Sequence, residues 1–301
     1  MYRFQFSALF FFVFLFTTKA QTTLVLNAVR DNTIYQDAPG NSNGKGENLF
    51  SGSNALNSPR RALLKFDIAA QIPAGAVITS VTLTLFCNKT TAGNSDISIH
   101  QLLADWGESN SNAMGEEGGG IAAVANDATW VSSFHLSNLW NSPGGDFTAT
   151  ASATTTVGDT GLSYNWTSSQ AIADVQNWLN NPSLNFGWIL IGNETISSTS
   201  KRFDSRENLN SAQRPQLSVT YDIASVAASF TFTGSGNWND ASNWSNNNIP
   251  PATLPADAEI IIDPLSDGEC VLNVPQTIST GGKLTVQANK KFRITGNLTI
   301  Q

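Results

Sequence analysis

Charged side chains are scarce in this chain of 301 residues, where Asp, Glu, Lys and Arg make up only 13% of the sequence. Charge repulsion therefore cannot keep the chain unfolded, which argues against a largely disordered protein. Acidic residues outnumber basic ones and give a net charge of −7, whereas a general nucleic-acid binder carries a basic excess. The composition indicates a folded protein with no nucleic-acid partner.

Cysteine, histidine and catalytic motifs are also scarce. Cys87 and Cys270 fall in different candidate domains, so we expect no disulfide between them. The sequence has no Gly-x-Ser-x-Gly elbow, no His-Glu-x-x-His and no phosphate loop. We therefore predict a protein that is not an enzyme. A polysaccharide lyase or hydrolase stays as an alternative, because a glycosidase needs only two suitably spaced carboxylates.

A long hydrophobic run occurs only at the start of the chain. Arg3 precedes a phenylalanine-rich stretch at residues 4–16, and small residues lead to Ala20. This order predicts a signal peptide at residues 1–20 and a secreted protein, extracellular or at the cell surface. An uncleaved anchor is the alternative. No later stretch is apolar enough to cross a bilayer, so we expect no membrane span after signal removal.

Apolar residues alternate with polar ones from residue 23 to about residue 222. Residues 61–68 place Ala62 and Leu64 on one face and Arg61 and Lys65 on the other. Residues 77–87 and 216–221 alternate in the same way, while residues 187–192 are apolar on both faces and indicate a central strand. Such strands, separated by turn signals, predict an all-β fold, an antiparallel β-sandwich.

One helix interrupts this pattern. Thr167 and Gln170 have the spacing of a capping box, apolar residues then recur at helical intervals, and Pro182 follows the end. We expect this short helix to pack across one end of the sandwich.

A linker at residues 223–229 is predicted to separate the domain at 23–222 from a different region at 230–301. Two tryptophans, Trp238 and Trp244, open this region, and three short apolar pairs follow at intervals of eight and six residues. The pairs are Leu284 with Val286, Phe292 with Ile294, and Leu298 with Ile300. They predict the first rungs of a small β-solenoid-like segment. Because no polar capping segment follows them, we expect a fragment or a marginally ordered region.

The longer domain also resembles a known family. The resemblance rests on residues 127–130, 143–147, 185–190, the segment Lys-Arg-Phe-Asp-Ser-Arg-Glu at 201–207, residues 61–67 with 72–76, and residues 214–217. Over residues 23–222 they resemble the DNRLRE domain, also classed as carbohydrate-binding module family ninety-six. The resemblance implies a jelly-roll β-sandwich that attaches to polysaccharide, with alginate-like uronic acid polymers among the known ligands. The tail from residue 230 resembles the β-repeat regions of secreted bacterial surface proteins.

Anionic sugars are bound by cationic side chains, and arginine offers two parallel N–H donors. The candidate cations are Arg61, Lys65, Lys201, Arg202 and Arg206. Ordinary solvated surface, or pairing of Arg206 with Glu207 or Asp204, is the alternative. Sugar rings also stack on aromatic faces, which makes Tyr35 and Trp188 candidates. Trp188 lies among apolar neighbours and favours the core instead.

A structural calcium ion is a further hypothesis, because hard cations bind clustered oxygen ligands. The candidate ligands are Asp31, Asn32, Asp204 and Glu207, although no spacing matches an EF-hand loop. Three functions thus stay open. They are a polysaccharide-binding module, a structural or adhesive surface protein with the sandwich as spacer, and the enzyme named above. The sequence does not predict the oligomeric state.

Overall fold

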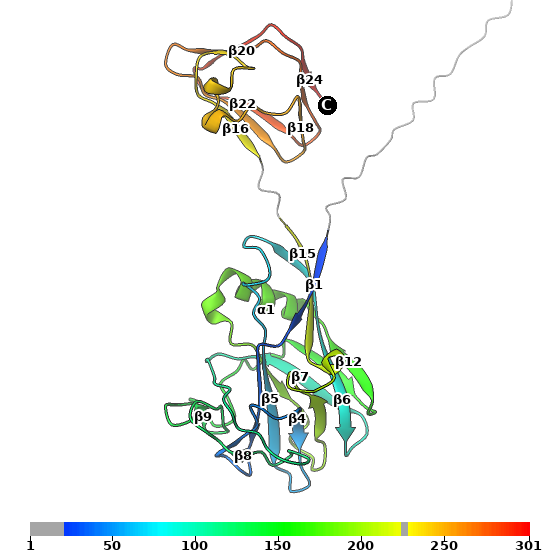
Figure 1. The fold of residues 1–301 in the computed structure, drawn as a ribbon. Helices are drawn as coiled ribbons and strands as arrows, with labels where there is room; N and C mark the ends of the chain where they lie inside the picture. Colours follow the sequence, from blue (N-terminus) through cyan, green and yellow to red (C-terminus); the bar gives the residue numbers. More distant parts are fainter. Residues whose placement is uncertain (1–20, 224–227) are drawn as a thin grey trace, which may run out of the picture. The chain divides into compact units, whose positions relative to one another are not determined.

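The computed structural model describes residues 21–223 and 228–301, which form two compact units divided after Ile223 (Figure 1). The predicted signal peptide and residues 224–227 of the predicted linker lie outside the described residues. Within the described part of the chain, no helix is long and apolar enough to cross a bilayer.

The larger unit is a sandwich of two antiparallel β-layers. The first layer has the order β1 (Thr22–Asn27), β15 (Gln216–Asp222), β6 (Val77–Thr90), β14 (Lys201–Asp204) and β4 (Asn48–Ser53), with β12 (Leu162–Trp166) also paired to β6. The second has β2 (Arg30–Tyr35) and β13 (Trp188–Ile191) paired to β5 (Pro59–Lys65), then β7 (Ser95–Gln101) and β11 (Ala153–Val157). The predicted all-β sandwich is therefore confirmed.

A single strand, β4, joins the two layers into one curled sheet. Residues 48–51 of β4 pair with β14, whereas Gly52 and Ser53 pair with β5. Gly52 has a φ of +108°, and a Cβ atom there would lie 2.8 Å from the carbonyl oxygen of Thr199. The turn between layers therefore requires glycine, which tolerates this backbone conformation and leaves room for the neighbouring chain.

The main core lies between the layers and follows the alternation of the sequence. Leu83, Leu85 and Cys87 of β6 are fully buried, and they share this core with Leu64 and Leu190 of the second layer. The predicted core position of Cys87 is confirmed, and both cysteines are free thiols.

Helix α1 (Ser169–Asn180) packs against β6, with Val175 and Trp178 buried in the main core. Its N-cap is Ser168, whose hydroxyl accepts a hydrogen bond from the backbone N–H of Ala171, and not Thr167 as the spacing predicted. The Thr167 hydroxyl donates instead to the carbonyl oxygen of Val81 in β6. The cap thus starts one residue later, because Thr167 is engaged by the sheet.

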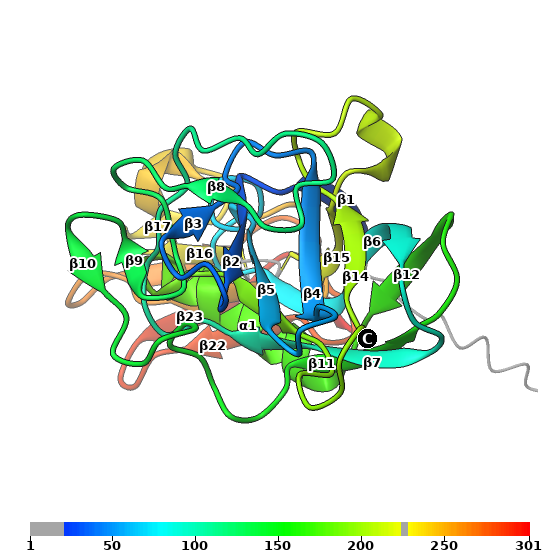
Figure 2. The ribbon, with the colours of Figure 1, turned by 90° about the horizontal axis from the view of Figure 1, so that it is seen from below.

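Residues 102–147 form a long segment over the outer face of the second layer, where Figure 2 shows its short strands grouped near β2. The segment contains β8 (Ile121–Ala122), β9 (Ser132–Phe134) and β10 (Asn138–Leu139). β9 pairs with β10, and β8 pairs with β3 (Asn41–Ser42), which lies outside the segment. Trp106, Trp130 and Trp140 from this segment pack on Leu63 and Ile189 in a second apolar cluster. The outer face of β5 is therefore covered.

The remaining elements of the larger unit are two short 3-10 turns, η1 (Pro182–Leu184) and η2 (Ser211–Gln213).

The smaller unit is a parallel β-solenoid with three sheets of three strands. One sheet holds β16 (Ser229–Phe232), β19 (Glu259–Ile262) and β22 (Lys283–Val286), the next β17 (Gly236–Asn237), β20 (Glu269–Leu272) and β23 (Lys291–Ile294), and the third β18 (Thr253–Leu254), β21 (Gln276–Ile278) and β24 (Leu298–Ile300). Two 3-10 turns, η3 (Ala241–Asn243) and η4 (Ser245–Asn247), follow β17.

The three apolar pairs of the sequence are not successive rungs of this solenoid. They fall on β22, β23 and β24, which belong to three different sheets and form the sides of one coil. The strand partner of Lys283 is Glu259, and that of Lys291 is Glu269, so these coils are 24 or 22 residues apart, whereas Glu259 pairs with Ser229 at a spacing of 30 residues. Trp238 and Trp244, which are in T-shaped contact with ring centroids 4.8 Å apart, are buried in the core of this unit.

Candidate functional site

Arg61 and Lys65 lie on the outer face of β5, but the segment 102–147 covers that face and leaves both half-buried. The Arg61 guanidinium makes a bidentate pair with Glu194, with Nε to Oε1 and Nη2 to Oε2 both at 2.7 Å. It also stacks over Trp130, at 4.8 Å from the ring centroid. Its charge is therefore already neutralised by a well-aligned carboxylate.

Lys65 is paired in a similar way. Its Nζ lies 3.6 Å from Oδ1 of Asp105, which also forms an ion pair with Arg30 at 3.3 Å. Burial, and next the charge of Arg30, lower the pKa of Lys65. Arg61 and Lys65 thus meet separate partners and do not form one open basic surface.

Three other candidates are buried. Lys201 is fully buried, and its Nζ donates to the Thr90 hydroxyl at 2.7 Å and to the carbonyl oxygen of Gly93 at 2.6 Å. Burial lowers the pKa of Lys201. The ring of Tyr35 is buried with its hydroxyl donating to the carbonyl oxygen of Glu117, and Trp188 packs on Trp178 in the main core. These three side chains are not accessible to a polymer.

Arg206 belongs to a cluster of two cations and three carboxylates. It pairs with Glu108 and, at 2.9 Å, with Glu207, while Lys45 reaches the same two carboxylates. Asp31 is fully buried and accepts the Arg206 backbone N–H through Oδ2 at 2.7 Å. Burial, and next the charge of Glu207, raise the pKa of Asp31 well above its ordinary value. Burial likewise raises the pKa of Glu207.

The four predicted calcium ligands do not converge. Asp31 and Glu207 share the cluster just described, in which Lys45 and Arg206 already supply the positive charge. The side-chain amide of Asn32 donates to the Ser42 hydroxyl, and its oxygen accepts the backbone N–H of Asn43. Asp204 accepts a hydrogen bond from the side chain of Asn88. No group of three His, Cys, Asp or Glu side chains in the described residues is placed to hold a metal ion. These residues do not fit calcium.

Arg202, whose side chain is 19% exposed, pairs with a carboxylate that is itself largely exposed, at a site that we call the Glu116 bridge (Lys89, Arg202 and Glu116). Oε2 of Glu116 accepts hydrogen bonds from Nζ of Lys89 and from Nη1 of Arg202, both at 2.7 Å. The hydrogen bond from Lys89, and the charges of both cations, lower the pKa of Glu116. The side chains of Lys89 and Glu116 are 50% and 72% exposed, so a dissolved ligand can reach the bridge.

The chain builds this bridge from residues far apart in sequence. Arg202 is on β14 and Lys89 on the neighbouring β6, where their register pairs them directly. Nε of Arg202 donates to Asn88 at 2.6 Å, which orients the guanidinium. Glu116 comes from a glycine-rich loop that Glu117 anchors by accepting the backbone N–H of Asn48 at 2.9 Å. Lys89 was not predicted as a site residue, because no local pattern marks it.

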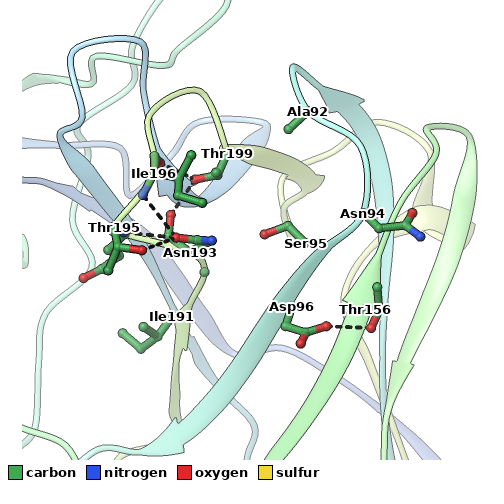
Figure 3. A pocket seen from close by; sticks show the side chains of 12 residues that line it. Ala92, Asn94, Ser95, Asp96, Thr156, Ile191, Asn193, Thr195, Ile196 and Thr199 are labelled. Atoms are coloured by element: carbon green, nitrogen blue, oxygen red, sulfur yellow. Dashed lines mark hydrogen bonds between the residues drawn. The ribbon is translucent and has the colours of Figure 1, made fainter.

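A wide hollow lies elsewhere on the larger unit, and we call it the Asn193 groove. It has a volume of about 860 Å³. Figure 3 shows its two walls, one from the turn after β13 and one from β7 with its preceding turn. Its lining residues are Ala92, Asn94, Ser95, Asp96, Thr156, Ile191, Gly192, Asn193, Glu194, Thr195, Ile196 and Thr199.

The comparisons with known proteins agree with the resemblance found in the sequence. Residues 22–113 match the model of carbohydrate-binding module family 96. The matched segment runs from β1 to the loop after β7 and includes Lys89, but it is shorter than the 23–222 stretch of the resemblance. No curated protein matches the chain.

Proposed function

We propose that this protein, whose residues 22–113 match the model of carbohydrate-binding module family 96, binds an anionic, alginate-like polysaccharide at the Glu116 bridge. The observation that carries the proposal is the carboxylate of Glu116, which two cations hold 2.7 Å away on an exposed loop. A uronic acid presents the same group, so a sugar carboxylate can replace Glu116 between Lys89 and Arg202.

Charge, and not aromatic stacking, is expected to provide most of the affinity. All eight tryptophans of the sequence are buried, so none offers its face to a sugar ring. Every predicted cation is paired with a carboxylate or buried, but the partner of Arg202 is the exposed Glu116, whereas Arg61 pairs with the half-buried Glu194 and Lys201 lies among carbonyl oxygens. Exposed ionic contacts are screened by salt, and this predicts strongly salt-sensitive binding.

We further propose that the module is non-catalytic and that the protein is secreted. The first proposal is supported by the match of residues 22–113 to a family of carbohydrate-binding modules. The second is supported by the signal-peptide pattern at residues 1–20. A structural or adhesive protein, with the sandwich as spacer, is the competing function.

The test is titration of the full chain with alginate, pectin and a neutral glucan at low and at high salt. Lys89→Ala with Arg202→Ala is expected to weaken alginate binding by about ten-fold at low salt, because each removes a charged hydrogen-bond donor. Lys283→Ala with Lys291→Ala is the matched control, since it removes two exposed charges from the solenoid. Equal affinity of both double variants for alginate, or no binding to either acidic polymer, would refute the proposal.

A further inference from the structure

We propose that the Asn193 groove is a second subsite that takes a neutral, hydroxyl-rich sugar residue of the same polymer. This inference deepens the proposed function, because it assigns the ligand to polysaccharides that carry both uronate and neutral residues. The volume of about 860 Å³ lies within the range of small-ligand sites.

One wall of the groove is held in place by its own hydrogen bonds. Oδ1 of Asn193 accepts from the backbone N–H of Thr195 at 3.0 Å and of Ile196 at 3.2 Å. Thr199 is tied to β4, because its hydroxyl accepts the Ser53 backbone N–H at 3.0 Å. The opposite wall is fixed by the Thr156 hydroxyl, which donates to Asp96 at 2.6 Å. A preformed groove loses little conformational entropy when a ligand binds.

The walls also carry polar atoms that the protein does not use. The Ser95 hydroxyl is buried and has no hydrogen-bond partner among the described residues. Only Oδ1 of Asp96 is engaged, which leaves Oδ2 as an acceptor. A sugar hydroxyl can therefore donate a hydrogen bond to this free Oδ2 of Asp96.

The charge of the groove disfavours a second carboxylate. No lysine or arginine lines it in the described part of the chain, and Asp96 is exposed. The other acidic lining residue, Glu194, is neutralised by Arg61. The apolar side chain of Ile196, which is 59% exposed, offers a surface for the C–H groups of a sugar ring. A neutral residue is therefore the chemical class that fits.

The groove adjoins the Glu116 bridge closely enough for one polymer to reach both. Ala92 and Thr199 line the groove. The residues next to them in the sequence, Thr91 and Ser200, line the hollow at the bridge. Consecutive residues lie about 3.8 Å apart along the chain, so neighbouring segments of the chain line the two hollows. The Thr91 hydroxyl, which donates to the Ser198 carbonyl oxygen at 3.0 Å, joins the two segments there.

The experiment compares three sets of oligosaccharides of equal length on the full chain by calorimetry. They come from alginate, which is all uronate, from cellulose, which is neutral, and from gellan, in which glucuronate is separated by neutral sugars. Gellan oligosaccharides are expected to bind about ten-fold more tightly than the other two, because they can form the hydrogen bonds of both subsites.

Ala92→Trp fills the groove without altering the backbone groups that bind Lys201 and Thr90. It is expected to reduce gellan affinity to that of alginate and to leave alginate affinity unchanged, which also reports a folded protein. Ala70→Trp, at an exposed position, is the matched control. Wild-type gellan affinity in Ala92→Trp, or gellan binding no better than alginate, would overturn the inference.

Failure of the bridge and failure of the groove give different results. If the proposed role of the Glu116 bridge is wrong, the double variant Lys89→Ala with Arg202→Ala will bind alginate as tightly as the wild type. The groove would still be supported if cellulose oligosaccharides bind the wild type and lose affinity in Ala92→Trp.

Discussion

Glu116→Gln is expected to raise the affinity for an anionic polymer, although it removes two hydrogen-bonded ion pairs. The carboxylate of Glu116 competes with the ligand for Lys89 and Arg202, both 2.7 Å away. Glutamine keeps the size of the side chain but not its charge, so the ligand carboxylate no longer displaces a charged rival. Exposed ion pairs of this kind are weak, and the expected gain is about two- to five-fold at low salt.

The assay is calorimetric titration of the full chain with alginate oligosaccharides at two salt concentrations. The gain should shrink at high salt, because the Debye length falls from about 10 Å at 0.1 M to about 3 Å at 1 M. Asp67→Asn is the control for net charge, since Asp67 is exposed and pairs with no cation in the described structure. Weaker binding by Glu116→Gln would mean that Glu116 supports the site instead of competing for it, and an equal gain in Asp67→Asn would reduce the effect to overall charge.

Three further predictions concern stability and are measured by urea unfolding of the full chain. Trp188→Phe removes the indole N–H that donates to buried Asp174 at 2.9 Å, and should cost about 1–3 kcal/mol; an unchanged midpoint would contradict this role. Lys201→Met leaves buried carbonyl oxygens without their donor and should cost about as much while alginate affinity stays unchanged; lost affinity in a folded variant would instead place Lys201 at the ligand. The pKa of Asp31 is raised, so the folded state binds more protons and the unfolding free energy should fall as the pH rises above the ordinary carboxyl range. Asp31→Asn should flatten this fall at pH values above the ordinary carboxyl range, and an unchanged slope would exclude Asp31 as its source.

The sandwich could be predicted because the alternation of apolar and polar residues in each strand shows which of its faces is buried. Leu83 and Leu85 recur at every second position and both are buried between the layers, as are Leu217 and Val219 of β15. A strand with one apolar face specifies its orientation locally, without knowledge of its partners.

The surroundings of Arg61 and Lys65 could not be predicted in the same way. Alternation tells which side chains share a face, but not what else covers that face. The one local clue is Leu63, an apolar residue between the two cations, which the structure buries beneath Trp106 and Trp130. An apolar side chain on an outer strand face indicates that another segment packs there.

The Glu116 bridge and the coil of the solenoid depend on pairing between distant residues. Lys89 and Arg202 are brought together by strand register, and Glu116 reaches them from a loop that another residue anchors. The apolar pairs near Leu284 and Phe292 repeat at a short interval because the chain turns a corner after each strand, whereas the true period is set by pairing between coils. Neither register nor corner geometry is visible in a local pattern.

The pairing of β1 with β15 makes the chain enter and leave the larger unit at one place, with Thr22 opposite Tyr221 (Figure 1). Tension between the two flanks would pull these strands apart sideways and break their backbone hydrogen bonds in succession, each of them individually weak. A strand pair loaded this way yields at low force, unlike strands that slide past each other along their whole length. This topology is therefore expected to carry tension between its two ends poorly, which would count against the competing function as a spacer in any form of the protein that is held at both ends.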